Sequence, residues 1–292
     1  MPNLKEVRIR IESVRSTQQI TSAMKLVSAS KLRRAQDAIL RMRPYAKKLN
    51  EILQNLSSSL EDMEIGSFTQ QRKPEKVLII VISANRGLCG AFNSNIIKLT
   101  NKVIREQYQE QYQAGNLHLL FLGKKAGEYF KRRNFQVVDI NTEIFDQLSF
   151  EKAVPVAEQL MQEFLSRNYD RIDLVYNQFK NAAVQSITHE QYLPIKPAEN
   201  KDDGKFSHDY LFEPDKVQIV NEMIPKSLKI QLYKALLDSQ AAEYGARMTA
   251  MHIATDNAQE LLKDLRLSYN KARQAAITNE IIEIVSGANA LK

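Results

Sequence analysis

The sequence predicts a helix-dominated α/β protein, in which long N- and C-terminal helices pair as an antiparallel coiled coil around an inserted α/β domain. Three observations support this fold class. An apolar register with coiled-coil spacing continues from residue 4 to residue 60, and a second register follows residue 225. Between them, short apolar runs alternate with amphipathic segments. Because neither long helix could bury its apolar positions alone, we expect each to be the partner of the other.

The first predicted element is an N-terminal coiled-coil helix over residues 1–60. Alternating steps of three and four residues select apolar side chains throughout, except between Gln18 and Ser28, where the selected positions are polar. At about 1.5 Å per residue this helix would be roughly 85 Å long, far longer than a helix inside a compact domain. Pro44 is expected to bend it. The selected positions are Leu4, Val7, Ile11, Val14, Gln18, Thr21, Lys25, Ser28, Leu32, Ala35, Ile39, Met42, Ala46, Leu49, Leu53, Leu56 and Leu60.

The middle of the chain is predicted to be a linker followed by the inserted domain. Residues 61–75 lose the apolar period and carry Gly66 and Pro74, which is typical of a linker. Residues 76–224 are predicted to form a Rossmann-like α/β domain, because strand-like runs alternate with helical patterns. The polar run 199–208 is expected to be a mobile loop. Strands are expected at 77–83, 117–122, 135–140, 172–176 and 183–189, and helices at 91–113, 124–132 and 151–166.

The last predicted element is a C-terminal coiled-coil helix over residues 225–292, which is expected to begin after Pro225 and to pair with residues 1–60. Near its end, the apolar side chains are spread too widely for one narrow seam. We therefore expect some of them to lie against another subunit, and a helix end buried within the same chain is the alternative. The register passes through Ile230, Leu237, Ala241, Tyr244, Met248, Met251, Thr255, Ala258, Leu262, Leu265, Tyr269, Ala272 and Ala276, then shifts to Ile277, Ile281 and Ile284.

Positive charge is concentrated in the N-terminal helix. The chain has a net charge of +7, and residues 1–60 hold twelve Lys or Arg against four Asp or Glu, a balance of +8 that leaves about −1 for the rest. Such a helix indicates a nucleic-acid, membrane-surface or acidic-protein partner, and a solvated face is the alternative. Nucleic-acid binders usually add stacking aromatic residues, whereas this helix has only Tyr45. An acidic protein partner fits better.

The sequence shows no arrangement of residues that would support catalysis or hold a cofactor. A single cysteine, Cys89, excludes an intrachain disulfide and a multi-thiolate metal site, and the four histidines share no ligand spacing. The glycines at 87 and 90, and at 123 and 127, lack the spacing of dinucleotide or P-loop motifs and are interpreted as structural turns. No apolar run reaches eighteen residues. The sequence thus predicts a non-catalytic protein without metal or cofactor, and an enzyme with helical arms is a less favoured alternative.

Several segments resemble the gamma subunit of the rotary F-type ATP synthase. Residues 277–290 meet in full the pattern Ile-Thr-x-Glu-x-x-Glu-x-x-x-Gly-Ala-x-Ala, which is that family's signature. Similar agreement at residues 17–25, 43–46, 86–90, 209–215 and 247–251 extends the resemblance over essentially the whole chain. It implies a rotating central shaft that couples ion flow to ATP synthesis, and a basic coiled-coil module that binds nucleic acid is the alternative function.

The resemblance also implies partners, a location and site residues. The coiled coil would lie inside a ring of three alpha and three beta subunits, and the α/β domain would contact epsilon and the ring of c subunits, on the cytoplasmic side of a bacterial inner membrane. No nucleic acid and no cofactor are implied. Positions matching contact or torque-transmitting residues are Met24, Lys25, Arg247, Gln274, Thr278 and Glu280. Basic residues that would face acidic loops of beta are Lys31, Arg33 and Arg34. Residues near epsilon and the c ring would be Asp209, Tyr210, Phe212 and Glu213.

Overall fold

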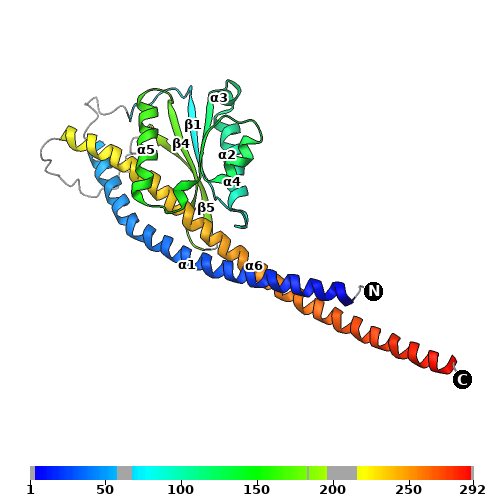
Figure 1. The fold of residues 1–292 in the computed structure, drawn as a ribbon. Coiled ribbons are helices and arrows are strands. Elements are labelled where there is room, and N and C mark those ends of the chain that lie inside the picture. Colours follow the sequence, from blue (N-terminus) through cyan, green and yellow to red (C-terminus); the bar gives the residue numbers. More distant parts are fainter. Residues whose placement is uncertain (1–3, 58–67, 183, 196–215, 291–292) are drawn as a thin grey trace. The chain divides into compact units, whose positions relative to one another are not determined.

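The computed structural model describes residues 4–57, 68–182, 184–195 and 216–290 of the chain. Two compact units are present, one made of Met1–Ala29 and Arg247–Lys292 and the other of Ser30–Ala246, and we call them the first and second units. The long helices α1 and α6 contribute to both, and Figure 1 shows every element. The elements are α1 (Leu4–Ser57), β1 (Val77–Ile82), α2 (Phe92–Gln107), α3 (Gln109–Gln113), β2 (Leu117–Leu122), α4 (Lys124–Lys131), β3 (Val137–Asn141), the 3₁₀ helix η1 (Glu143–Phe145), α5 (Phe150–Leu165), β4 (Arg171–Phe179), β5 (Gln185–Leu193) and α6 (Lys216–Ala290).

A five-stranded sheet with the order β3-β2-β1-β4-β5 forms the centre of the second unit. The first four of these strands are parallel, and β5 joins the edge antiparallel to β4. All six residues of β1 are buried, which explains why this strand reads as one continuous apolar run rather than an alternating one. The predicted Rossmann-like sheet is therefore confirmed, with one antiparallel edge strand.

Helices cover both faces of this sheet, and the two faces have separate apolar cores. The odd-numbered residues of β1 pack in one core with side chains of α2 and α4. The even-numbered residues pack in the other core with α5 and with residues 224–236 of α6. This alternation follows from the period of two in a strand, which sends successive side chains to opposite faces. Residues 224–236 of α6 are thus part of the second unit's core.

In the first unit, the two long helices run antiparallel. Thr21 of α1 is hydrogen-bonded to Thr255 of α6, with 2.9 Å between the hydroxyl oxygens. Four residues later in α1, Lys25 Nζ lies 3.2 Å from Nδ1 of His252, which is three residues earlier in α6. Partner numbers fall as α1 numbers rise, which is the pattern of antiparallel helices.

The same direction holds in the second unit. Lys31 Nζ lies 5.6 Å from the ring centroid of Tyr244, and Tyr45, further along α1, has Lys226 Nζ 6.0 Å from its ring centroid. Within each unit, therefore, the predicted antiparallel pairing of the N- and C-terminal helices is confirmed.

The predicted apolar registers match the burial of the two helices. Every register position of α1 from Leu4 to Leu49 is buried or half-buried, as is every register position of α6 from Ile230 to Ala272. From Ala276 to residue 289 every α6 side chain is exposed. The alternative of a helix end buried within the same chain is therefore wrong for the residues that the structure describes.

Several element boundaries differ from those predicted. Helix α6 begins at Lys216 and continues through Pro225, since burial of Ile224 and Leu228 in the core offsets the hydrogen bond that proline removes. The helix expected over 91–113 is interrupted at Tyr108, whose ψ of 27° and φ of −129° are not helical. Strands β4 and β5 are longer than expected. The predicted loop at 199–208 and residues 61–67 of the predicted linker lie outside the described residues, and the rest of the linker, residues 68–75, holds no helix or strand.

Candidate functional site

The polar stretch of the α1 register contacts α6 through hydrogen bonds in the first unit. Thr21 is 8% exposed, and its hydroxyl meets that of Thr255 across the pair. Lys25 approaches His252, and His252 Nδ1 also lies 3.3 Å from Oδ2 of Asp256 one helical turn further on. Because polar side chains satisfy each other here, the break in the apolar pattern does not break the pairing of the helices. Such contacts fix the register of a pair at some cost in stability.

Of the residues implied to contact partners, three are at least half-buried in the first unit. Arg247 of α6 is 8% exposed, although an arginine is seldom buried to this extent. Met24 of α1 is half-buried, as is its neighbour Lys25. The polar seam and these side chains belong to the same unit, so the structure brings Met24, Lys25 and Arg247 into one stretch of the helix pair.

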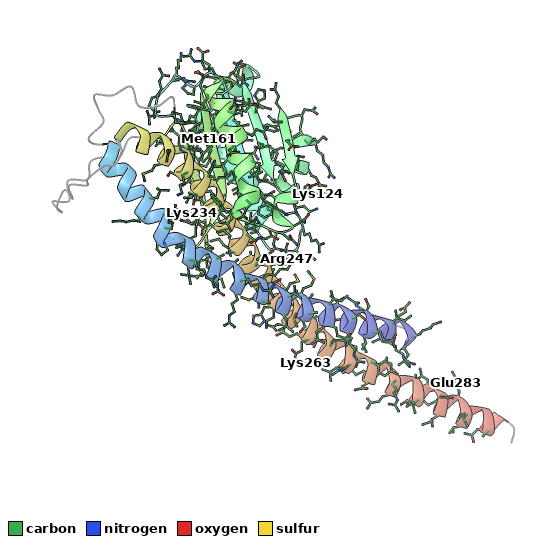
Figure 2. The ribbon with its side chains drawn as sticks, turned by 60° about the vertical axis from the view of Figure 1, so that its left-hand side comes forward. Lys124, Met161, Lys234, Arg247, Lys263 and Glu283 are labelled. Atoms are coloured by element: carbon green, nitrogen blue, oxygen red, sulfur yellow. The ribbon has the colours of Figure 1, made fainter. Side chains whose placement is uncertain are left out.

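The three other implied contact residues of α6 lie on its exposed end. Gln274, Thr278 and Glu280 are all exposed, and Thr278 Oγ1 donates a hydrogen bond of 2.9 Å back to the carbonyl oxygen of Gln274. Around Glu283, which Figure 2 labels, side chains project from α6 beyond the start of α1. The apolar side chains there are Ile277 (44% exposed), Ile281 (55%), Ile282 (57%), Ile284 (65%) and Val285 (53%). This end combines a wide apolar surface with polar groups, as a protein interface does.

The basic residues Lys31, Arg33 and Arg34 are exposed on α1 in the second unit. Lys31 also contacts the ring of Tyr244, which orients its charge. A cluster of exposed cations on a helix is suited to acidic groups of a partner. The other predicted site residues, Asp209, Tyr210, Phe212 and Glu213, lie outside the described residues.

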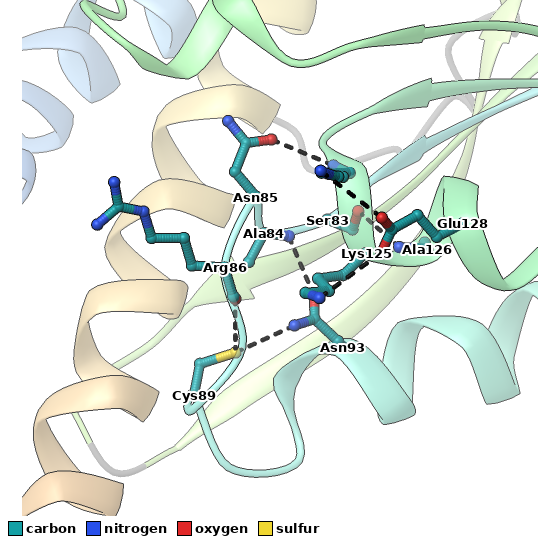
Figure 3. A network of polar contacts seen from close by, with 10 residues as sticks. Ser83, Ala84, Asn85, Arg86, Cys89, Asn93, Lys125, Ala126 and Glu128 are labelled. Carbon is teal, nitrogen blue, oxygen red and sulfur yellow. Dashed lines mark hydrogen bonds and ion pairs between the residues drawn. The ribbon is translucent and has the colours of Figure 1, made fainter.

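The turn after β1 is held by internal hydrogen bonds, as Figure 3 shows. The backbone N–H of Ala84 donates to Asn93 Oδ1 at 3.1 Å, and the N–H of Lys124 donates to Asn85 Oδ1 at 3.1 Å. Ser83 Oγ accepts from the N–H of Ala126 at 3.2 Å. These side chains satisfy groups of the protein itself, which agrees with the interpretation of both glycine-containing segments as structural turns. Among the described residues, no group of three potential metal ligands is found.

Sequence reasoning missed a buried polar cluster around Asp173 of β4. Its carboxylate is fully buried and accepts hydrogen bonds from Tyr108 Oη at 2.5 Å and from Arg171 Nε at 3.0 Å, and it lies 2.7 Å from His189 Nε2. Burial by itself raises the pKa of Asp173, but the hydrogen bonds from His189 and Tyr108 and the charge of Arg171 outweigh it and hold the pKa below its ordinary value. The sequence signal that could have revealed this cluster is the position of an acidic residue, Asp173, within the otherwise apolar run 172–176.

A second buried acid, Asp238 of α6, was also missed. It is 1% exposed, and Arg43 Nη2 lies 3.8 Å from its Oδ1. Burial raises the pKa of Asp238 to about 6, against the lowering effect of the Arg43 charge. The apolar register of α6 does not indicate that Asp238 is buried, because a single aspartate in an amphipathic helix usually faces water.

The described residues contain no helix with an apolar stretch long enough to cross a bilayer. They offer exposed helical surfaces rather than a cleft lined by reactive groups. Chemically, the arrangement can bind other proteins through apolar and charged contacts along the helix pair.

Comparison with known sequences gives one consistent family. A family model described as ATP synthase matches residues 3–291. The chain is 56% identical over 291 residues to the ATP synthase gamma chain of Christiangramia forsetii, with 100% of this chain and 99% of the relative covered. It is 54% identical over 292 residues to the ATP synthase gamma chain of Flavobacterium johnsoniae, with 100% and 99% covered.

Comparison with solved structures finds the same fold. A chain of the Euglena gracilis mitochondrial ATP synthase rotor in rotational state 1 matches with a TM-score of 0.64 and 22% identity, over 94% of this chain and 98% of that chain. A chain of the same organism's OSCP/F1/c-ring assembly in rotational state 3 matches with a TM-score of 0.68 and 21% identity, over 99% and 94%. Both likenesses support the long helix pair with an inserted sheet.

Proposed function

We infer the function of this protein from one premise: the chain belongs to the ATP synthase gamma chain family. We propose that it is the rotating central-stalk subunit of a rotary ATP synthase and that it carries no catalytic residue of its own. The observation that carries the proposal is the antiparallel pair of long helices whose C-terminal end exposes apolar side chains from Ile277 to Val285. The nucleic-acid alternative gains no support from the comparisons.

The partners follow from this position. We propose that three alpha and three beta subunits surround the helix pair, and that epsilon and a ring of c subunits contact the part of the chain that holds the sheet. The subunit would then be peripheral, on the cytoplasmic side of a bacterial inner membrane. The exposed cations Lys31, Arg33 and Arg34 would contact acidic groups of beta, and the segment from Asp209 to Glu213 would lie near epsilon and the c ring.

Physical reasoning explains how such a subunit can direct chemistry without taking part in it. The helix pair presents different side chains in different directions, so three equivalent catalytic subunits around it make unequal contacts and have unequal nucleotide affinities. A hundredfold difference in affinity corresponds to about 2.7 kcal/mol. Burying one isoleucine side chain contributes about 1.5–3 kcal/mol, so a single anchor such as Ile281 suffices in magnitude. Rotation then moves each catalytic subunit through the three states in turn.

Reconstitution tests the proposed function. Purified alpha and beta subunits are mixed with the chain, and ATP hydrolysis is measured for the mixture and for each component. The mixture is expected to hydrolyse ATP rapidly, whereas the chain alone is expected to be inactive. Turnover by the chain alone, or a mixture no faster than alpha and beta without it, contradicts the proposal.

The proposed coupling residues have a separate test in the assembled enzyme. Met24→Lys places a charge on the half-buried side of α1, so it is expected to reduce proton pumping per ATP hydrolysed more than it reduces assembly. Ser13→Lys adds the same charge at an exposed position of the same helix and is the matched control. If Met24→Lys lowers pumping and assembly equally, Met24 serves packing alone.

A further inference from the structure

A buried carboxylate lies where α1, α6 and β4 meet in the second unit. Asp238 of α6 is 1% exposed, and neither of its oxygens has a hydrogen-bond partner of good geometry among the described residues, although the Phe179 backbone is close enough to lower its pKa. Arg43 of α1 approaches it, with Nη2 at 3.8 Å from Oδ1. The same Nη2 donates a hydrogen bond of 3.2 Å to the carbonyl oxygen of Phe179, at the end of β4. One guanidinium nitrogen thus connects α1 with the sheet and with α6.

A contribution to fold stability does not account for the buried charge of Asp238. A buried carboxylate costs free energy unless it is paired and hydrogen-bonded, and a contact of 3.8 Å with a cation whose side chain is 47% exposed offsets only part of that cost. An amide or an apolar side chain would suit packing better at this position. A buried polar group without a hydrogen-bond partner of good geometry therefore calls for another explanation.

Helix α6 also contacts the backbone after β4 at Gly245, which follows Asp238 along the helix. A Cβ atom built at Gly245 would lie 3.0 Å from the carbonyl oxygen of Ala182, which follows β4. The absence of a side chain at Gly245 thus permits direct contact between α6 and the backbone after β4. In contrast, α1 reaches β4 through the long side chain of Arg43. The position of Arg43, and hence of α1 against β4, depends on what holds its guanidinium.

We propose that Asp238 and Arg43 are positioning residues for rotation: ionised Asp238 holds Arg43 against the Phe179 carbonyl, and protonation of Asp238 releases it. We call the contact between these three residues the Arg43 tether. The proposal rests on the proposed function, because the stiffness between the helix pair and the sheet would set how faithfully a rotor passes torque from one to the other. It adds a proton-dependent step to that stiffness.

Burial raises the pKa of Asp238 from 3.8 to about 6. The charges of Arg43 and Lys234 and a hydrogen bond with the Phe179 backbone lower this pKa, and the charge of Glu190 on β5 raises it. The Tyr176 hydroxyl of β4 donates a hydrogen bond of 3.4 Å to Glu190 and faces the same region. The tether is therefore mostly closed at pH 7.5 and mostly open at pH 5.5.

Protonation of Asp238 is expected to raise the free energy of unfolding and to weaken the Arg43 tether. Because the pKa of Asp238 is higher in the folded chain than its ordinary value of 3.8, the folded chain binds this proton more tightly than the unfolded chain. Its contribution to the free energy of unfolding thus falls as pH rises from about 4 to about 6, and it stays low above that. The tether, in contrast, strengthens over the upper part of this range. A residue that served packing alone would change both observables in the same direction.

Hydrogen–deuterium exchange of the full chain tests the tether without its partners. Asp238→Asn removes the charge, and Asp264→Asn, at an exposed position of the same helix, is the matched control. At pH 7.5, amides of α1 around Arg43 are expected to exchange about tenfold faster in Asp238→Asn, which is the effect of losing the charge-assisted hydrogen bond from Arg43 to the Phe179 carbonyl. The urea midpoint of this variant is expected to rise. After correction for intrinsic rates, the wild type should approach this behaviour at pH 5.5. Equal exchange in the two variants at pH 7.5 overturns the proposal.

A second variant guards against misfolding, and the complex supplies the functional readout. Arg43→Ala, at a half-exposed side chain, is expected to speed exchange in α1 equally at both pH values. In the complex with alpha and beta subunits, a probe attached to the sheet should show broader angular fluctuations in Asp238→Asn than in Asp264→Asn at pH 7.5. Equal fluctuations overturn the role in rotation. Failure of the wild type to restore ATP hydrolysis would instead reject the proposed function, so the two failures are distinguishable.

Discussion

Removal of the Asp173 carboxylate is expected to destabilise the second unit strongly. Asp173 is fully buried and is surrounded by three donors, Tyr108, Arg171 and His189. Asp173→Ala leaves the Tyr108 hydroxyl without its acceptor, while Arg171 and His189, which are partly exposed, can reach water. Breaking a buried charged network by removing one partner costs about 3–5 kcal/mol. We expect a loss in that range in the free energy of unfolding.

The two oxygens of Asp173 allow a graded comparison. Tyr108 and His189 contact Oδ2, whereas Arg171 contacts Oδ1. Asp173→Asn keeps one acceptor oxygen for Tyr108 but places an amide near the Arg171 donor, which can turn toward solvent. We expect a smaller loss of about 1–3 kcal/mol for this variant. Combined with Tyr108→Phe in a double-mutant cycle, it should show a coupling of about 1–3 kcal/mol.

The pH dependence gives this prediction a sign. The pKa of Asp173 in the folded chain lies below its ordinary value of 3.8. Its stabilising contribution is therefore fully present above that ordinary value, and it is lost as pH falls through the lower, folded value. The difference in unfolding free energy between the wild type and Asp173→Ala should accordingly be constant at neutral pH and shrink in acid.

Urea unfolding of the full chain measures these differences. Tyrosine fluorescence is a suitable signal, because the chain has eleven tyrosines and no tryptophan. Asp139→Ala, at an exposed position of β3, is the control and should change stability by less than about 0.5 kcal/mol. A loss below about 1 kcal/mol in Asp173→Ala, or a difference from the wild type that does not shrink in acid, refutes the reasoning about this cluster.

Four further predictions concern glycines and the exposed helix end. Gly245→Ala should lower the free energy of unfolding, measured in urea, by about 1–3 kcal/mol because its Cβ would lie 3.0 Å from the Ala182 oxygen. Gly287→Ala, whose Cβ would have nothing within 4 Å, should raise helix stability, measured by circular dichroism, by up to about 1 kcal/mol. Gly123→Ala should prevent folding, measured as loss of soluble protein, because φ is +113° and its Cβ would lie 1.9 Å from a backbone oxygen. Ile284→Asn, at 65% exposure, should leave stability within about 0.5 kcal/mol but weaken binding to alpha and beta subunits in a pull-down with purified components; a stability loss without a binding loss contradicts this.

The long helices could be predicted from the sequence because their information is local and periodic. A register that repeats over about eight heptads specifies which side of a helix is buried, and the same side is buried in the structure from Leu4 to Leu49. The polar interval from Gln18 to Ser28 kept its phase, which allowed the register to be followed across it. The burial of Thr21 and Ser28 confirms that these positions face α6 despite their polarity.

The departures from prediction arise where contacts distant in sequence decide the outcome. The helix expected over 91–113 is interrupted at Tyr108, whose hydroxyl contacts Asp173 of β4, and no local propensity reveals this contact. Likewise, α6 continues through Pro225 because residues on both sides of the proline are buried in the core. The candidate contact residues came from resemblance rather than from pattern, and their roles stay predictions. The Asp238 site could not be found because its environment combines α1, α6 and β4.

The exposed end of α6 also has a consequence for how the subunit gains its final structure. An isolated helix shorter than about 12–15 residues is marginal in water, and residues 276–289 have no packed side chains to stabilise them within this chain's described parts. Isoleucine and valine, which are frequent here, favour helices less than unbranched residues do because their side chains are stiff at χ1. The helical state of this end therefore depends on propagation from the paired segment before it and, in the complex, on burial against the surrounding subunits. Each isoleucine that becomes buried against a partner contributes about 1.5–3 kcal/mol. The same contacts would therefore stabilise the helical end of α6 and make the affinities of the catalytic subunits unequal. Substitutions here should thus alter partner binding before they alter the stability of the free chain.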